Sequence, residues 1–560
     1  MAGGRLGSRG AVDDAALRRK VQRGFRLRGL SVQVDACDAL VNVLARETEQ
    51  KKALKVLLDA IKVRLRHQDG NRSNSRNSGL VDIDIVSAVV ADLSKDDNDL
   101  MQEAIVLISS FAMPEVKYNP TRRQFYALPK SPSAKGTLHA NAALKCGLFR
   151  ERYTLLFQRL MRHPLFAPPL LAGMPEADTT RVELTQLEAL VGTEENMKHC
   201  LLGLLSRLED ENYYLEDLNG RVRVDLSSVA ECHVGMFTEG CIVLVEGVLS
   251  EGIFRVQSLA SPPSETRAKS ISANGGDEFH FGNDSASAVS AHESRRLKAL
   301  EKKATDTMFV MLSDVHLDSP VVFSKLRELF AGCEPLCPPV FVFMGNFTQK
   351  PFGVGATQCR PEEFRAHFAR LGKLISEFPG LVKYSHFIFV PGPLDPGSAN
   401  VYPRSPIPDT FSNALGENLP QSARYTFTTN PCRIKFYTQE IVLFRDDIVS
   451  KMRRNCVVQP SESFHADGKP VQLTEHLVQT LIDQAHLSPL PIHVRPTYWQ
   501  YDAAMRLYPT PDVLILADHY DQYYWNYNAS DVFNPGSFPT DFSFVVYRPA
   551  SREVEFSKIE

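Results

Sequence analysis

The sequence predicts a multidomain α+β protein in which a helical part, a strand-rich part and an α/β part follow one another. Three observations support this prediction. Apolar residues recur at helical spacing near the start of the chain, a hairpin signal at Asn219-Gly220 lies among short strands, and after residue 305 apolar strands end in polar residues. A chain of 560 residues is also too long for a single hydrophobic core.

The composition is that of a globular protein without a dominant charge. Hydrophobic residues make up 43% and charged residues 23%, and 63 Lys+Arg against 66 Asp+Glu leave a net charge of -3. No overall basic excess therefore draws the chain to nucleic acid, although a local patch can do so. We expect no membrane span and no secretory signal, because no apolar run is long enough and none follows residues 1–5. The 10 Cys form no regular framework and are expected to be free thiols.

Residues 1–112 are predicted to form an N-terminal helical domain. Leu17, Val21 and Phe25 form the apolar stripe of one helix, and apolar residues at helical spacing predict further helices over residues 31–46, 52–65, 82–93 and 100–111. A basic set surrounds the first stripe: Arg18, Arg19, Lys20, Arg23, Arg26 and Arg28. This set is either a solvated helix face or a surface for nucleic acid or an acidic partner.

Residues 113–180 are predicted to be a linker followed by a helix that leads into the next domain. Residues 118–136 carry proline and basic side chains, and residues 150–161 have helical spacing. Prolines at 164, 168, 169 and 175 then disfavour regular structure.

Residues 181–260 are predicted to form an OB-type β-barrel. Short apolar and alternating segments at 200–205, 213–217, 222–226, 242–248 and 253–256 indicate strands, and Asn219-Gly220 is a strong hairpin turn. Such barrels often bind single-stranded nucleic acid on aromatic side chains. Here acidic residues flank Tyr213 and Tyr214 and repel phosphate, which favours a barrel that docks protein.

Residues 261–304 are predicted to be a flexible insertion. Residues 261–292 are rich in Gly, Ser, Ala and Pro, and residues 293–305 indicate a charged helix that returns to the fold.

Five strands that end in polar residues follow in residues 305–560. The ends are Asp314-Val315-His316, Gly345-Asn346, the segment 391–395, Ala485-His486, and the segment 517–520. In an α/β sheet such strand ends are where chemistry is found. Carboxylate and imidazole side chains at the first end are metal-ligand types.

The order of these ends resembles the calcineurin-like metallophosphoesterases, so residues 305–560 are expected to form a calcineurin-like phosphoesterase α/β sandwich. The family pattern is Asp-x-His, Gly-Asp, Gly-Asn-His-Asp/Glu, a lone His, and Gly-His-x-His. The resemblance implies two metals that share a bridging carboxylate and activate water against a phosphate ester.

This chain departs from the family pattern at three positions. The bridging carboxylate is replaced by Asn346, the Asn ligand by Pro393, and the catalytic His by Leu394, which can neither donate nor accept a proton. His486 matches the lone His. At the last end the ligand pair falls on Asp518 and Tyr520, so that His519 lies where no ligand is required.

We therefore expect an inactive phosphoesterase domain with no catalytic residue, no cofactor and no metal. Asp314, His316, His486 and Asp518 remain as either ligands of a single weakly bound metal or hydrogen-bonded polar groups at strand ends, and we favour the second interpretation.

A barrel followed by an inactivated phosphoesterase domain resembles the B-subunits of the eukaryotic replicative DNA polymerases, and within them the polymerase epsilon branch. The segments that carry the resemblance are FRERYT at 149–154, FTTNPCRI at 427–434, TQEI at 438–441, FRDD at 444–447, RNCV at 454–457, HLSPLP at 486–491 and FNPGSF at 533–538. The N-terminal helices match that branch by type, being similar to the lid of AAA+ ATPases.

The resemblance implies a nuclear, non-catalytic accessory subunit that acts as a scaffold in DNA replication and repair. The implied partners are the zinc-bearing C-terminal region of the polymerase epsilon catalytic subunit, the histone-fold small subunits of the complex, replicative helicase components, and DNA through the complex. Arg433, Arg445, Arg453 and Arg454 are either solvated or contacts for an acidic partner or DNA. The alternatives are a residual single-metal phosphoesterase or nuclease, and a single-stranded DNA-binding barrel.

Overall fold

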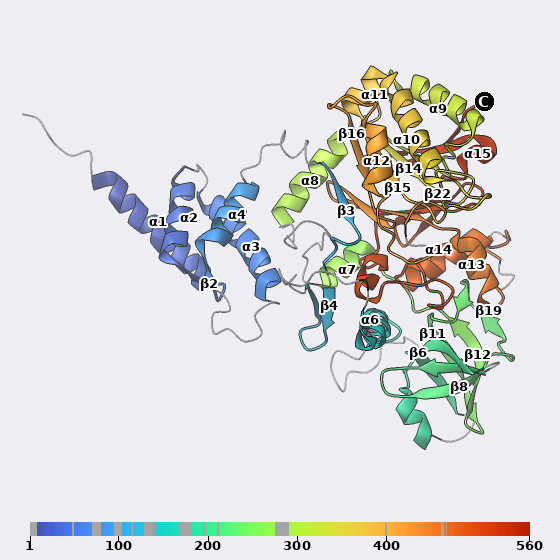
Figure 1. Ribbon diagram of the computed structural model, residues 1–560. Coiled ribbons are helices and arrows are strands. Elements are labelled where there is room, and N and C mark those ends of the chain that lie inside the picture. Colours follow the sequence, from blue (N-terminus) through green and yellow to red (C-terminus); the bar gives the residue numbers. More distant parts are fainter. Residues whose placement is uncertain are drawn as a thin grey trace, which may run out of the picture.

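A computed structural model describes residues 8–46, 50–69, 80–93, 104–114, 116–127, 138, 140–167, 181–193, 197–209, 212–274, 291–397, 400–460, 464–465 and 468–560. Figure 1 shows a C-terminal α/β region with a barrel beside it and a group of helices to one side. No helix in these ranges is both long and apolar enough to cross a bilayer.

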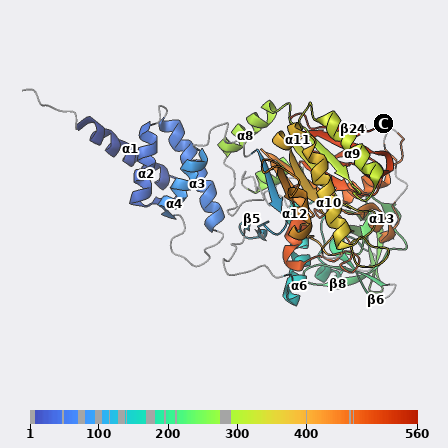
Figure 2. The same cartoon turned by 45° about the horizontal axis from the view of Figure 1, so that its top comes forward.

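The group of helices at the N-terminal end confirms four predicted helices. The helices are α1 (Ser8–Arg26), α2 (Val34–Arg46), α3 (Gln50–Asp69) and α4 (Ile83–Leu93). Their apolar stripes meet in one core, in which Leu17, Val21 and Phe25 are buried as predicted. The short parallel pair β1 (Ser31–Val32) and β2 (Leu80–Val81), which was not predicted, ties the starts of α2 and α4 together. These helices lie apart from the α/β region in two views (Figures 1 and 2).

The helix predicted over residues 100–111 is wrong. Residues 105–109 form strand β3 (Ile105–Ser109), which pairs antiparallel with β17 (Cys432–Phe436) at the edge of a C-terminal sheet. Apolar residues lie on both faces of β3 because both faces of this sheet are covered. The resulting continuous apolar run has the same sequence pattern as a segment of a buried helix. Residues 100–103 lie outside the described residues.

The segment between β3 and the barrel is partly regular. The hairpin β4 (Val116–Asn119) and β5 (Gln124–Ala127) occurs where a linker was predicted. The predicted helix is α6 (Ala142–Leu160), which starts earlier than expected because the Asn141 side chain caps it by accepting a hydrogen bond from Leu144 N at 3.1 Å.

The predicted barrel is present and closed. The hairpin across Asn219-Gly220 forms as predicted between β7 and β8, and β11 pairs with both β6 and β12, which closes the sheet on itself. The elements of this part are η1 (Leu187–Gly192), β6 (Lys198–Glu209), β7 (Asn212–Glu216), β8 (Arg221–Asp225), β9 (Glu231–Cys232), β10 (Phe237–Thr238), β11 (Ile242–Ser250) and β12 (Ile253–Ala260).

The prediction that the whole of residues 261–292 is irregular is also wrong. Residues 267–273 form helix α7 (Arg267–Ala273), and its neighbours Glu265, Ser270 and Asn274 are buried. Glu265 holds this segment in place by pairing with Arg162 of the segment after α6 and by accepting a hydrogen bond from Ser270. Residues 275–290 lie outside the described residues, and the predicted returning helix is α8 (Ala291–Lys303).

Two six-stranded sheets form the C-terminal region. The first has the order β16-β15-β14-β13-β23-β24 and the second the order β21-β22-β20-β18-β17-β3. The remaining strands are β13 (Phe309–Ser313), β14 (Val340–Met344), β15 (His386–Val390), β16 (Arg424–Phe427), β18 (Gln439–Arg445), β20 (Val513–Ala517), β21 (Tyr523–Tyr527), β22 (Ser530–Asn534), β23 (Ser543–Arg548) and β24 (Glu553–Lys558).

Three hydrophobic clusters define four layers in this region. Phe309, Val342 and Ile441 belong to a cluster between the two sheets, whereas the outer face of each sheet is covered by helices. Helices α9 (Pro320–Cys333), α10 (Pro361–Ser376), α11 (Pro379–Tyr384) and α12 (Asp409–Gly416) cover the first sheet, and α13 (Ile448–Arg454) and α14 (Leu473–Asp483) cover the second. The short elements are β19 (Cys456–Val458), η2 (Trp499–Met505) and α15 (Phe538–Asp541).

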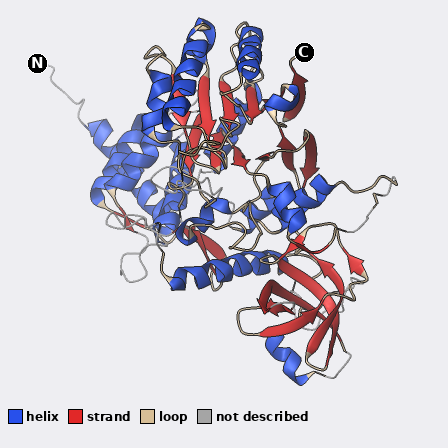
Figure 3. Cartoon of the chain, turned by 45° about the vertical axis from the view of Figure 1, so that its right-hand side comes forward, coloured by secondary structure: helices blue, strands red, loops and turns tan. Residues whose placement is uncertain are grey.

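The barrel is joined to the C-terminal region in two places. Helix α6 contacts both β6 and η2. Figure 3 shows the strands of the barrel below the larger sheets. Strand β10 pairs antiparallel with β19, which follows α13. The barrel part and the C-terminal region are therefore held together by two separate contacts.

Candidate functional site

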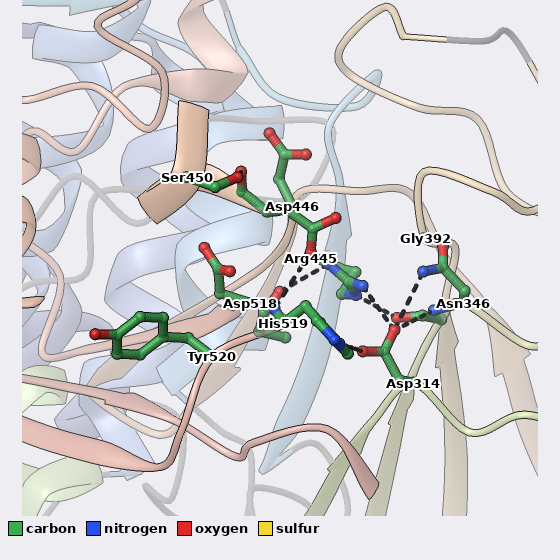
Figure 4. A network of polar contacts seen from close by, with 12 residues as sticks. Asp314, Asn346, Gly392, Arg445, Asp446, Ser450, Asp518, His519 and Tyr520 are labelled. Atoms are coloured by element: carbon green, nitrogen blue, oxygen red, sulfur yellow. Dashed lines mark hydrogen bonds and ion pairs between the residues drawn. The ribbon is translucent and has the colours of Figure 1, made fainter. Parts of the chain in front are cut away.

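The ends of β13 and β14 meet as the sequence predicts. These strands are parallel neighbours, so Asp314 and Asn346 follow them at the same edge of the sheet. Asn346 donates from its backbone N and from Nδ2 to Asp314 Oδ1, at 3.1 Å and 3.2 Å. Figure 4 shows both side chains facing a third group, Arg445.

Arg445 ends β18 of the second sheet and reaches across to the first. Its Nη2 donates to Asp314 Oδ1 at 2.6 Å, and both side chains are almost fully buried. Burial alone would raise the pKa of Asp314, but the positive charge of Arg445 and the hydrogen bonds from His519, Arg445 and Asn346 together outweigh burial and hold that pKa below its usual range. The Asp314 carboxylate is therefore charged and already neutralised by a protein cation.

The third strand end, after β15, holds the Asn346 side chain on its other side. Asn346 Oδ1 accepts a hydrogen bond from Leu394 N at 2.8 Å. Asp395, to which sequence reasoning gave no role, accepts from Phe347 N at 2.8 Å and from Gly392 N at 2.7 Å, and burial raises its pKa to about 6. A Cβ at Gly345 would lie 1.9 Å from Asp395 Oδ2, which explains the glycine. Pro393 and Leu394 thus contribute a tight turn to this edge.

His486 does not join this group, which counts against the alternative in which it shares a metal with Asp314 and agrees with the favoured interpretation of a hydrogen-bonded polar group. Its Nδ1 accepts from Ser488 N at 3.0 Å, which leaves Nε2 to donate to Asp502 Oδ1 at 3.2 Å. Arg152 of α6 pairs with the same carboxylate. His486 therefore belongs to a buried contact between α6 and the C-terminal region.

His519, rather than Asp518 or Tyr520, is the residue of the last strand end that reaches Asp314. Its Nδ1 lies 3.4 Å from Asp314 Oδ2, and this contact raises the pKa of His519. Sequence reasoning assigned His519 no role as a metal ligand, and the structure gives it a hydrogen bond to Asp314 that was not predicted. Asp518 Oδ2 instead accepts from Val449 N at 2.8 Å at the start of α13, and burial raises its pKa to about 6.

The four residues that the sequence left as possible ligands are therefore divided among different contacts. His316, half-buried two residues after Asp314, has its pKa lowered mainly by burial. Within the described ranges, no three or more His, Cys, Asp and Glu side chains gather as metal ligands would. The pair of metals that the phosphoesterase resemblance implies does not fit this donor set, because Asp314 already accepts hydrogen bonds from Arg445, Asn346 and His519.

A groove of about 700 Å³ opens beside this network. It is lined by Asp447, Val449, Ser450, Arg453, Arg454, Gln459, Leu473, Asp518, His519 and Tyr520. Arg453 and Arg454 are exposed, whereas Arg433 and Arg445 are buried in ion pairs with Glu440 and Asp314. The expectation that Arg433 and Arg445 are surface cations is therefore wrong.

Comparison with known proteins agrees with the barrel and with the C-terminal region. Residues 142–263 match the family described as DNA polymerase epsilon subunit 2-like, OB-fold domain, which confirms the predicted OB fold, and residues 309–524 match the family of the DNA polymerase alpha/epsilon B subunits. Among solved structures, an archaeal phosphodiesterase aligns with 45% of this chain and with 100% of its own chain at 9% sequence identity. The TM-score of 0.23 is too low to indicate a shared fold.

Relatives that align along almost the whole chain are also named as subunits of DNA polymerase epsilon. The chain is 36% identical over 548 residues to human DNA polymerase epsilon subunit 2, with 97% of this chain and 99% of the human chain covered. It is 34% identical over 553 residues to the DNA polymerase epsilon B subunit of Arabidopsis thaliana, with 97% and 99% covered, and 32% identical over 553 residues to subunit 2 of Drosophila melanogaster, with 98% and 99% covered. The chain therefore belongs to the family of DNA polymerase epsilon subunit 2.

Proposed function

We propose that this chain is the non-catalytic accessory subunit of a DNA polymerase epsilon complex and acts as a scaffold for the C-terminal region of the catalytic subunit. The observation that carries the proposal is the similarity to proteins of that name over 97% of the chain. Its setting would be the nucleus, in DNA replication and repair.

We also propose that residues 305–560 are an inactive calcineurin-like phosphoesterase domain. Asn346, Pro393 and Leu394 replace a bridging carboxylate, a metal ligand and a general acid. The hydrogen bonds that occupy Asp314 support this proposal, because they leave it poorly suited to bind two metals.

The proposed division of the chain keeps the sequence-based boundaries for the helical domain (1–112), the linker and helix (113–180), the barrel (181–260), the insertion (261–304) and the phosphoesterase domain (305–560). Two segments cross these boundaries. Strand β3 pairs with β17 of the last domain, and α7 is fixed by contacts with the segment after α6. The N-terminal helices are proposed to be similar to an AAA+ lid.

We place part of the partner contact in the groove beside α13. It lies near the barrel part, because β19 follows α13 and pairs with β10. Both acidic residues that line it are held within the chain, Asp447 by Arg445 and Asp518 by Val449 N, so Arg453 and Arg454 dominate its charge. The partners proposed are the zinc-bearing C-terminal region of the catalytic subunit and, within the larger complex, the histone-fold subunits and helicase components.

Co-purification tests this proposal. The full chain co-expressed with the C-terminal region of the polymerase epsilon catalytic subunit is expected to elute as one complex, and elution as a monomer would contradict the proposed function. Arg453→Glu with Arg454→Glu is expected to weaken the complex at least roughly tenfold. The matched control is Lys302→Glu with Lys303→Glu, an exposed basic pair at the end of α8. An unchanged affinity in the arginine variant would refute the groove while leaving the partner in place.

A further inference from the structure

Four oxygen atoms from separate strand ends converge on the guanidinium of Arg445. Its Nε donates to Gly345 O at 2.6 Å, Nη1 donates to Ala517 O at 3.2 Å and to Asp447 Oδ1 at 2.8 Å, and Nη2 donates to Asp314 Oδ1 at 2.6 Å. These oxygens lie at the ends of four strands. Strands β13 and β14 belong to the first sheet, and β18 and β20 belong to the second. Figure 4 shows the guanidinium at the centre of this arrangement.

The four acceptors suit a planar cation. A guanidinium presents five N–H donors in a fixed fork, and here four separate oxygens are each met by a donor. Two acceptors are carboxylates, and the side chain of Arg445 is only 1% exposed, so the charge is compensated away from water. A lysine ammonium has three donors from one nitrogen and does not match this spread.

The arrangement also shapes the groove beside it. Asp447, which bonds Arg445, accepts from His519 N at 3.2 Å, and the His519 side chain reaches Asp314. Asp447 and His519 both line the groove. We therefore expect the positions of Asp447 and His519 in the groove to depend on the Arg445 guanidinium.

We propose that the ends of β13, β14, β18 and β20 build a binding site for a planar cation, and that Arg445 is a positioning residue that permanently fills it. The guanidinium ties the two sheets together at the edge where the phosphoesterase resemblance places metals, and it orients Asp447 and His519 in the groove. The inference does not depend on the proposed partner, because it concerns contacts within this chain alone.

Chemical rescue of the full-length chain tests this. Arg445→Ala removes the guanidinium and leaves its four oxygens, so the variant is expected to have a lower Tm than the wild type and to regain roughly 5 °C when methylguanidinium binds. Methylammonium at the same concentration is the shape control and is expected to give less than half of that gain. Thermal unfolding followed by intrinsic fluorescence measures both shifts.

The matched control variant is Phe444→Ala, which opens an apolar cavity at the preceding, fully buried position of the same strand. Its Tm is expected not to rise with methylguanidinium. Equal rescue by methylammonium, rescue of Phe444→Ala to the same extent, or no response of Arg445→Ala would overturn the proposal. If the Arg445→Ala variant is obtained only in unfolded form, it is refolded in the presence of each cation. Folded protein obtained only with methylguanidinium would support the proposed site. No folded protein in the presence of methylguanidinium would contradict it.

Discussion

Two ion-pair clusters of this molecule use the same chemistry for different purposes. The tip cluster, formed by Asp314, Arg445, Asp447 and His519, ties the ends of two sheets within the C-terminal region. The α6 cluster, formed by Arg152, His486 and Asp502, ties the helix before the barrel to that region. The tip cluster shares one arginine between two carboxylates, whereas in the α6 cluster the one carboxylate of Asp502 serves Arg152, His486 and, at 4.0 Å, Arg506.

This difference predicts which cluster is more sensitive to the loss of one residue. Arg445 keeps one carboxylate partner if the other is lost, but Asp502 is the shared partner of both Arg152 and His486. A buried charge that loses its partner is strongly destabilising, so the α6 cluster should be the more sensitive of the two.

The largest expected effect comes from Asp502→Ala. It leaves Arg152 buried without its carboxylate and should lower the free energy of unfolding by about 3–5 kcal/mol, as measured by urea denaturation. The double variant Arg152→Met with Asp502→Leu removes both charges and should recover most of that loss. A double variant as unstable as the single one would show that packing, rather than an unpaired charge, explains the effect.

The next effect depends on pH. Burial, more than any other cause, lowers the pKa of His486 to about 4 from an ordinary 6.5. In the unfolded chain, His486 therefore binds a proton below about pH 6.5. In the folded chain, it binds that proton only at about pH 4 and below. Stability from this group is complete above about pH 6.5 and falls by up to about 3 kcal/mol as the pH drops to about 4.

The comparison with His486→Gln isolates that contribution. Buried carboxyls with raised pKa, namely Asp395, Asp483 and Asp518, act in the opposite direction in both proteins and cancel in the difference. Urea midpoints measured from about pH 7.5 to about pH 4.5 should converge for the two proteins as the pH falls, and parallel curves would contradict the assigned pKa.

A smaller loss is expected for Asp314→Asn in the tip cluster. The amide keeps an oxygen for Asn346 and Arg445 but loses the charge, while Asp447 still faces Arg445. The free energy of unfolding should fall by about 2 kcal/mol. A loss as large as that of Asp502→Ala would mean that Asp447 gives Arg445 no useful compensation.

The smallest effect is expected for His519→Gln. The His519 side chain is 67% exposed, so solvent screens its pair with Asp314, and the loss should be about 0.5 kcal/mol or less. Its effect on the partner affinity can be larger than on stability, because His519 lines the groove. A loss above about 2 kcal/mol would place His519 among the main supports of the tip cluster.

Local pattern predicted much of the fold but only part of the site. The strands that end at Ser313 and Met344 and the hairpin at Asn219-Gly220 were predicted, because each depends on a short run of neighbouring residues. Strand β3 was missed, because apolar residues on both of its faces look helical. At the site, the meeting of Asp314 with Asn346 followed from parallel strands, but Arg445 and His519 lie 131 and 205 positions from Asp314, where no local pattern connects them.

The family motifs, the helices and strands with clear periodicity, and the amide and apolar residue types at Asn346, Pro393 and Leu394 can all be read from the sequence, because these are properties of residue types in order. Which charges are paired depends instead on tertiary contacts. The tertiary structure buries Arg445 against Asp314 and places His486 with Asp502, since the cost of burying a charge depends on which distant group the fold brings within hydrogen-bond distance.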